Sequence, residues 1–426
     1  MKRLFAILCA FSLASSAESF ADQAFQFGIG THMAQNGVTS AVVLSSATKA
    51  GFTSFRDEVY WSQVEGKKGV LAFPPRFAEL EKAVRSLRAS GGRPLIILDY
   101  GNGNYDGGGL VLSEDALIAW DKYVRFIVNH FGSDVDQYEV WNEWNTGTGS
   151  KPKEATGSAS AYARLLERTY RAVKEENAAA VVIAGATAGV DMAWTKQLLA
   201  AGAMLHMDAF SAHSYTLFGS LNNPESGILR LDELQQLFQS ELGGTRSLPI
   251  YVTEMGWPTN TGRYGVPEHE VANYIVRFAF LARSRPWIAG IWWYDLRDDG
   301  DDDTNKEHRF GFLRRDLTPK PAFNAVTRVS PLLKESTNIH AYRLPGGGYA
   351  VTGMRKGGEW LVAWKLETAA LAGNRTIAAA DADFRGFDWV ERELTEPGVP
   401  SFWNKVGSKW VKWSMSPQAP ILIKVD

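Results

Sequence analysis

The run Pro94-Leu-Ile-Ile-Leu98 is an unbroken apolar segment that follows a helical pattern and precedes a glycine-rich turn. Strands that are buried on both faces of a parallel sheet have such near-continuous apolar sequences. A second run, Val181-Val-Ile-Ala184, has the same character. Both runs therefore predict strands in the interior of a parallel sheet.

Eight segments of this kind alternate with amphipathic helical patterns between residues 25 and 335. The predicted strands are 27–32, 54–59, 94–101, 137–145, 180–188, 208–215, 248–257 and 288–298, and the clearest helical patterns are 77–90, 113–131, 159–176, 229–242 and 267–284. Eight strands alternating with helices over roughly 300 residues predict an α/β fold, the (β/α)₈ TIM barrel. An open doubly wound sheet is the alternative, but no Gly-x-Gly-x-x-Gly motif follows a strand to support it.

The character of the chain changes at about residue 337. Short alternating stretches follow, separated by turns rich in Gly and Pro, at 349–354, 359–366, 387–393, 409–415 and 420–425. They predict a small C-terminal β-sandwich-like domain at 336–426, after a barrel domain at 22–335. Six of the fifteen Trp lie in this second domain. We expect them to serve core and interface packing, with a sugar-binding platform as the alternative.

The N-terminus has the pattern of a secretory signal peptide. Lys2 and Arg3 precede an apolar run at 4–13, and small residues allow cleavage after Ala17 or Ala21. The run is too short to span a bilayer, so we expect residues 1–21 to be removed from a periplasmic or secreted protein. A buried first helix is the alternative. The only cysteine, Cys9, lies in this segment, so the mature chain would have no disulfide and no thiol chemistry.

The charge balance excludes some classes of partner. The chain has 45 basic and 47 acidic residues, a formal net charge of -2. This balance predicts no nucleic-acid partner. We expect no membrane insertion, because no later apolar stretch is long enough to span a bilayer, and we expect a monomer. The chain has fifteen Trp, fourteen Tyr and twenty-two Phe, which can fill a large core but can also stack on flat apolar ligands such as sugar faces.

No motif predicts a metal or a cofactor. The sequence has no zinc motif, no phosphate-binding loop and no nucleophile elbow. The run Asp298-Asp-Gly-Asp-Asp-Asp303 allows a calcium interpretation. It lacks the twelve-residue loop that ends in Glu, so we expect a solvated or substrate-facing acidic loop instead.

Two glutamates lie where a barrel places its chemistry, at the carboxyl ends of strands. The fourth predicted strand ends in Tyr138-Glu-Val-Trp-Asn-Glu-Trp-Asn145 and the seventh in Ile250-Tyr-Val-Thr-Glu-Met-Gly-Trp257. Each delivers one carboxylate, Glu143 and Glu254, into an aromatic surround. Two carboxylates in different surroundings form the acid–base pair that glycoside hydrolysis needs.

The segments Trp141-Asn-Glu143 and Val252-Thr-Glu-Met-Gly-Trp257 resemble the paired motifs of glycoside hydrolase clan A. The details are closest to family 39 and to bacterial exopolysaccharide glycosidases, and the resemblance covers residues 25 to 330. It implies that Glu143 is the general acid/base and Glu254 the nucleophile. It also implies that Asn142 hydrogen-bonds the sugar 2-hydroxyl.

The same resemblance extends to further residues. Arg56 would keep Glu254 ionised, with a structural bridge to Asp57 or Glu58 as the alternative. Tyr215 would donate a hydrogen bond to Glu254, and His213 would line the sugar subsite; His32 is a weaker candidate for the same subsite. Because strand alternation places Trp292 and Trp293 on opposite faces, only one can form the floor of that subsite, and Trp293 is our choice. Trp144 and Trp257 flank the glutamates as candidates for outer sugar subsites, with core packing as the alternative.

Together these features predict an exported retaining glycoside hydrolase whose substrate is a polysaccharide or oligosaccharide. The many aromatic residues favour internal cleavage of a bacterial exopolysaccharide or similar polymer. An exo-acting β-xylosidase-type enzyme is one alternative. A non-catalytic polysaccharide-binding or assembly protein is another, although such a protein has no need of a paired acid and nucleophile.

Overall fold

The computed structural model describes residues 24–366, apart from 151–156, 220, 245, 344–347, 357 and 365, together with the backbone of 401–406, 409–414 and 421–424. The predicted signal peptide, and the predicted strand at 387–393 with its Trp389, lie outside the described residues.

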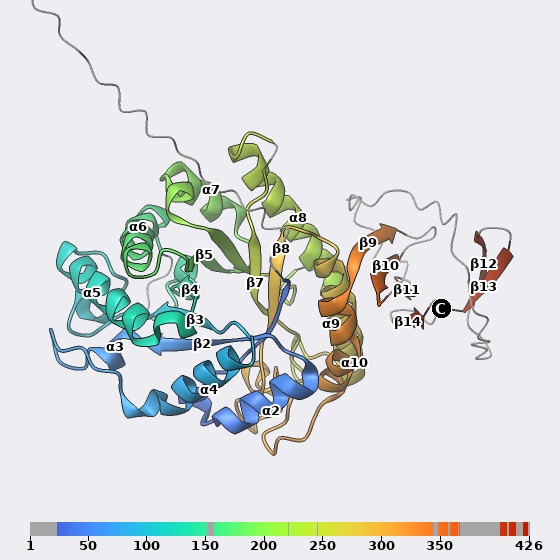
Figure 1. The fold of residues 1–426 in the computed structure, drawn as a ribbon, viewed down its shortest axis with the longest axis horizontal. Coiled ribbons are helices and arrows are strands. Elements are labelled where there is room, and N and C mark those ends of the chain that lie inside the picture. Colours follow the sequence, from blue (N-terminus) through green and yellow to red (C-terminus); the bar gives the residue numbers. More distant parts are fainter. Residues whose placement is uncertain are drawn as a thin grey trace, which may run out of the picture.

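Eight parallel strands close into a barrel in chain order, and β8 pairs back onto β1 (Figure 1). They are β1 (Gln26–Gly30), β2 (Ser54–Tyr60), β3 (Leu95–Asp99), β4 (Gln137–Val140), β5 (Val181–Ala188), β6 (Ala209–His213), β7 (Ile250–Met255) and β8 (Ile288–Trp293). The predicted TIM barrel is confirmed, and closure of the sheet excludes the open doubly wound alternative.

Helices surround the barrel (Figure 1). They are α1 (Met33–Asn36), α2 (Ser40–Ala50), α3 (Trp61–Val64), α4 (Ala78–Ala89), α5 (Glu114–Phe131), α6 (Ala159–Glu176), α7 (Met192–Ala200), α8 (Pro224–Glu241), α9 (Glu268–Arg283) and α10 (Pro321–Glu335). Short 3₁₀ helices are η2 (Pro75–Phe77), η3 (Asp106–Gly108), η4 (Gly132–Asp134), η5 (Trp144–Thr146), η6 (Ala203–His206) and η7 (Lys306–His308). Local sequence sets their ends: the Ser113 side chain accepts a hydrogen bond from Ala116 N at the start of α5, and Gly132 ends it.

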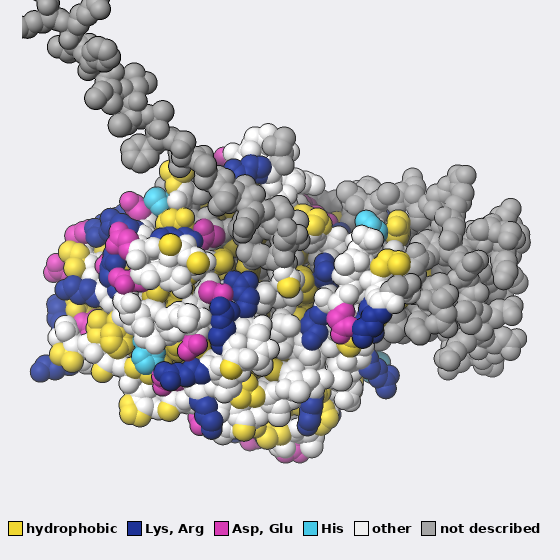
Figure 2. Space-filling model, viewed as in Figure 1, with side chains coloured by type: hydrophobic (Ala, Val, Ile, Leu, Met, Phe, Trp, Pro, Cys, Tyr) yellow, Lys and Arg dark blue, Asp and Glu magenta, His cyan; other side chains and the backbone are white. Residues whose placement is uncertain are grey.

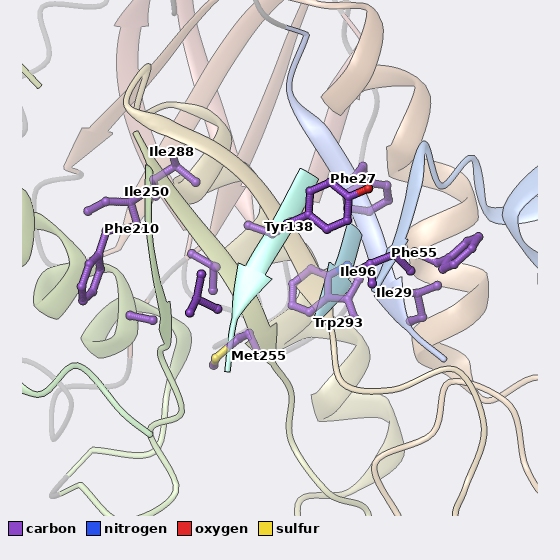
Figure 3. Packing of buried hydrophobic residues seen from close by; sticks show 14 of the residues in the cluster. Phe27, Ile29, Phe55, Ile96, Tyr138, Phe210, Ile250, Met255, Ile288 and Trp293 are labelled. Atoms are coloured by element: carbon purple, nitrogen blue, oxygen red, sulfur yellow. The ribbon is translucent and has the colours of Figure 1, made fainter. Parts of the chain in front are cut away.

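The barrel strands are apolar on both faces because one face packs inside the barrel and the other packs against the surrounding helices. A small cluster contributed by five strands fills the interior: Leu95, Ile97, Val181, Ile183, Ala209, Tyr251 and Trp292. The alternate side chains, such as Ile96, pack with the surrounding helices in a larger cluster, part of which Figure 3 shows. This two-sided burial explains the near-continuous apolar runs in the sequence.

A small antiparallel sheet follows the barrel. Helix α10 ends at Glu335 and β9 begins at Thr337. The strands are β9 (Thr337–Arg343), β10 (Tyr349–Arg355), β11 (Gly358–Trp364) and β14 (Ile421–Lys424), in the order β14-β11-β10-β9, and β12 (Ser401–Val406) pairs separately with β13 (Lys409–Ser414). β9 and β10 lie beside α9 and α10 in Figure 1.

Two tryptophans attach this sheet to the barrel. The Trp360 ring lies 5.1 Å from the ring of Phe280 on α9, and its Nε1 donates a hydrogen bond to Ser336 Oγ at 2.8 Å. Trp364 Nε1 donates to Glu225 Oε1 on α8 at 2.8 Å. Both side chains are buried, so these two tryptophans serve the packing role.

Basic and acidic side chains are interspersed over the face shown in Figure 2, as the balanced composition predicts. Among the described helices, none combines the length and apolar character needed to cross a membrane.

Candidate active site

Glu143 is held by an unusual backbone just after β4. Both Trp141 and Glu143 have left-handed conformations, with φ of 65° and 55°. Backbone hydrogen bonds fix this turn, from Trp141 N to Leu98 O and from Glu143 N to Ala186 O at 2.8 Å. Non-glycine residues in this region are strained, and such strain concentrates at functional sites.

Glu143 and Glu254 face each other across the mouth of the barrel. One carboxylate oxygen of each, together with a ring nitrogen of His213, lie within 4.8 Å of one another. Glu254 lies within β7, and its residue is only 8% exposed. The two predicted carboxylates therefore belong to one site.

Arg56 and Tyr215 fix the carboxylate of Glu254. Arg56 Nη1 donates to Glu254 Oε1 at 2.7 Å, and Tyr215 OH donates to Oε2 at 3.0 Å. The same guanidinium donates to Glu139 at 2.6 Å and to Asn142 Oδ1 at 2.7 Å. The buried Arg56 therefore aligns both Glu254 and Asn142. Its structural ion pair is with Glu139, and not with Asp57 or Glu58 as the alternative prediction had it.

His213 lies beneath the two glutamates and does not line the cavity, contrary to the prediction. Its side chain is fully buried, with Nδ1 at 2.9 Å from Glu143 Oε1 and 3.5 Å from Glu254 Oε2. Burial on its own lowers the pKa of His213, but the two carboxylates outweigh it and raise the pKa. Burial on its own raises the pKa of Glu143, but the hydrogen bond and the charge of His213 outweigh it, so the pKa of Glu143 is lowered. His213 therefore affects the site by orienting the two glutamates and by shifting the pKa of Glu143, without contacting a ligand itself.

Within the described residues, Glu143, His213 and Glu254 form the one group with donors close enough to hold a metal ion. A cation there would compete with the contacts that the Glu254 carboxylate already makes with Arg56 and Tyr215. The acidic run 298–303 forms no such group: Asp298 is buried against Lys320 Nζ at 2.6 Å, and Asp301 to Asp303 are exposed. The geometry therefore favours acid–base chemistry over metal binding.

A cavity of about 1020 Å³ opens above the two glutamates. Five of the predicted site residues line it: His32, Asn142, Glu143, Tyr215 and Glu254. The cavity continues along α8 and reaches the C-terminal sheet, where further lining residues are Arg343, Tyr349 and Leu366. Its volume is at the upper end of the usual range for ligand pockets, about 300–1,000 Å³.

The three predicted tryptophan contacts are wrong. Trp293 is completely buried and points away from the barrel interior, where its ring packs against Phe278 and Phe312; Figure 3 shows it among the core side chains. Trp144 is also completely buried, and Trp257 is 1% exposed. All three serve packing, because none of them can reach a ligand in the cavity.

Tyr294, which directly follows the last residue of β8, is the aromatic side chain that lines the cavity at this strand end. Its ring lies edge-on to His32 at 5.3 Å and to Phe310 at 5.3 Å. Tyr100, after β3, also lines the cavity, and its OH accepts a hydrogen bond from Asn142 Nδ2 at 2.9 Å. Sequence reasoning missed both tyrosines, although Tyr294 directly follows Trp292 and Trp293 in the sequence.

His32 follows β1 and is held by an ion pair. Its Nδ1 lies 2.9 Å from Glu58 Oε1, and Gln35 Nε2 donates to the same oxygen at 2.6 Å. Burial lowers the pKa of His32 on its own, but the attraction of Glu58 outweighs it and raises the pKa to about 10. His32 therefore presents a charged imidazolium at the cavity wall.

The closed barrel and the glutamates at the carboxyl ends of β4 and β7 define the chain as a (β/α)₈ protein with its candidate active site on the usual face. No protein-family model matches the sequence, and a search of curated proteins finds no match.

Comparison with solved structures identifies similar folds. A family 39 glycoside hydrolase from Bacteroides cellulosilyticus has a TM-score of 0.73 and 23% identity, covering 96% of this chain and 82% of that chain. A family 39 β-xylosidase from Caulobacter crescentus has a TM-score of 0.60 and 16% identity, covering 95% and 96%. A family 5 glycoside hydrolase from Streptomyces cattleya has a TM-score of 0.58 and 16% identity, covering 73% and 82%. The predicted likeness to family 39 is therefore confirmed at the level of the fold.

Proposed function

We propose that the protein is a retaining glycoside hydrolase that cleaves β-glycosidic bonds with Glu143 and Glu254. This proposal is carried by the close approach of the two carboxylates, of which one oxygen each lies within 4.8 Å of the other. Retaining enzymes hold the two groups about 5–5.5 Å apart, whereas inverting enzymes need about 6.5–9.5 Å to admit a water molecule.

In the first step, Glu254 attacks the anomeric carbon while Glu143 gives a proton to the departing oxygen, which leaves a covalent glycosyl-enzyme. In the second step, Glu143 takes a proton from water, and that water's oxygen replaces Glu254 at the anomeric carbon. Arg56 and Tyr215 hold Glu254 in position for attack. Asn142, held by Arg56 and Tyr100, is placed to hydrogen-bond the sugar beside the reacting carbon.

His213 positions the carboxylate of Glu143 and influences its pKa. The pKa of Glu143 is lowered, with burial opposing and the His213 contact producing the shift, and the pKa of His213 is raised. The 2.9 Å contact between His213 Nδ1 and Glu143 Oε1 orients the carboxylate of Glu143 toward its task as acid and base. This role follows from the contact and assigns His213 a positioning function.

A polymeric substrate, cut internally, fits the extended cavity best. The cavity runs from the glutamates along α8 to Tyr349 in the C-terminal sheet, farther than one sugar unit requires. With the predicted export signal, this favours a bacterial exopolysaccharide or a similar polymer as substrate. The likeness to a β-xylosidase structure from Caulobacter crescentus supports exo-acting cleavage as a second candidate.

Two matched substitutions test the proposal. Glu254→Gln should abolish turnover of polysaccharides and of aryl β-glycosides, because the nucleophile is lost. Glu143→Gln should lower kcat/KM about 10²–10⁴-fold on substrates with poor leaving groups and much less on activated aryl glycosides, which need little acid assistance.

The control is Glu268→Gln, which removes a partly exposed glutamate on α9 that pairs with Arg314. It should leave turnover unchanged on a panel of bacterial and plant polysaccharides and of p-nitrophenyl β-glycosides. Full activity of the Glu254→Gln variant would refute Glu254 as the nucleophile. A wild-type protein that binds these glycans without releasing reducing ends would favour a binding or assembly protein.

A further inference from the structure

One aromatic side chain at the cavity is left open to solvent. Phe218, in the loop between β6 and α8, lines the cavity and is 70% exposed. Single exposed apolar side chains are common on protein surfaces, so the position of Phe218 at the cavity is the informative feature.

The Phe218 ring is held in place by its neighbours. Tyr264, from the loop after β7, lies edge-on to it, with ring centroids 5.0 Å apart and planes at 75°. The guanidinium of Arg263 covers the Tyr264 ring at 4.6 Å, and Lys306 Nζ lies 5.7 Å from the centre of the Phe218 ring. The ring is therefore part of a small ordered aromatic surface.

The loop that carries Phe218 is anchored to the barrel. Thr216 Oγ1 donates to Asn222 Oδ1 at 2.9 Å, and the buried Trp257 Nε1 donates to the same oxygen at 3.0 Å. Gly219 N closes a turn onto Thr216 O at 3.0 Å. Trp257, which the sequence placed at a sugar subsite, thus supports the aromatic residue that the cavity presents.

We infer that Phe218, supported by Tyr264, is the stacking platform of an outer subsite that binds a further sugar unit of the substrate, beyond the unit held at Glu143 and Glu254. The inference rests on the proposed function. Sugar rings have apolar faces that stack on aromatic rings, and the surrounding polar groups of Thr216, Lys306 and Glu307 are placed to bind hydroxyls. Continuity with the cavity of the two glutamates identifies the occupant as the same glycan chain.

The test compares Phe218→Ala with wild type on unsubstituted β-linked oligosaccharides of two to six units, in xylose, glucose and mannose series, and on the matching p-nitrophenyl monosaccharides. We expect kcat/KM on the longer oligosaccharides to fall about tenfold, through KM, and the activated monosaccharide to be affected far less. Phe218→Trp should retain the wild-type preference for length. The control Leu205→Ala truncates a side chain that is 78% exposed outside the cavity, and it should match wild type.

Calorimetric binding of the same oligosaccharides to Glu254→Gln, with and without Phe218→Ala, gives a readout independent of turnover. Equal losses on short and long substrates, or no loss on either, would overturn the subsite. A wild-type protein inactive on every substrate would overturn the proposed function itself, and with it the glycan platform. Because Phe218 is mostly exposed, its truncation should leave the far-ultraviolet circular dichroism unchanged.

Discussion

Replacing His32 with Gln should remove a pH-dependent part of the stability of the fold. The change keeps a hydrogen-bond donor near Glu58 but deletes the positive charge of the ion pair. Asp57 and Asp295 also face His32 and contribute to its raised pKa. The substitution therefore isolates the charge of His32 within an acidic surround.

The magnitude follows from the pKa of His32, which rises from 6.5 to about 10, as burial lowers it and Glu58 more than compensates. At about 1.4 kcal/mol per pH unit, the difference corresponds to at most about 5 kcal/mol. A histidine with a raised folded-state pKa stabilises the fold fully below pH 6.5, progressively less as the pH rises, and not at all above about pH 10.

Urea unfolding curves of wild type and His32→Gln at several pH values measure this contribution. The stability gap between the two proteins should narrow by about 2.7 kcal/mol between pH 7 and pH 9. His269→Gln, which changes an exposed histidine on α9, is the control and should show no such gap. A gap for His32→Gln that is independent of pH would refute the ion pair as the source of its stabilisation.

Three further results are expected. Proton NMR of early hydrolysis should show the β-anomer as first product, and first release of the α-anomer would exclude a retaining mechanism. Glu225→Gln should destabilise the fold by about 3–5 kcal/mol in urea, because it breaks the buried pair with Arg277 and weakens the bond from Trp364; a change below about 1 kcal/mol would contradict that role. Activity should persist in chelator and strong reductant, because Lys320 already neutralises Asp298 and the mature chain is expected to lack cysteine; recovery by added calcium after loss in chelator would show a metal site.

The sequence predicted the barrel well because each strand is buried on both faces. All eight predicted strands are present, with ends shifted by a few residues. Helix α8 begins at Pro224, five residues before the predicted start, since Asn223 caps it and Gly227 interrupts the apolar pattern. Strand β9 was missed because its side chains are exposed or half-buried and its sequence, Thr337 to Arg343, is mostly polar.

The same two-sided burial explains why the aromatic site residues were misassigned. Alternation correctly placed Trp292 and Trp293 on opposite faces. It could not show which face was the interior, because both faces are apolar, and the lining residue Tyr294 lies just past the end of β8. Charged residues gave a stronger signal: Glu143, Glu254 and Arg56 converge because polar groups in apolar strands need partners.

Glu225 connects ligand binding in the cavity with the packing of the C-terminal sheet. It lines the far part of the cavity, and it also accepts the Trp364 hydrogen bond that fastens the C-terminal sheet to α8. Suppose that a glycan binds this part of the cavity more tightly when the C-terminal sheet is packed against α8 than when it is detached. By thermodynamic reciprocity, the bound glycan then stabilises the packed sheet by the same free energy. Longer glycans that reach Glu225 would then protect the C-terminal sheet from proteolysis more than short ones do. An isolated barrel would not show this dependence on glycan length.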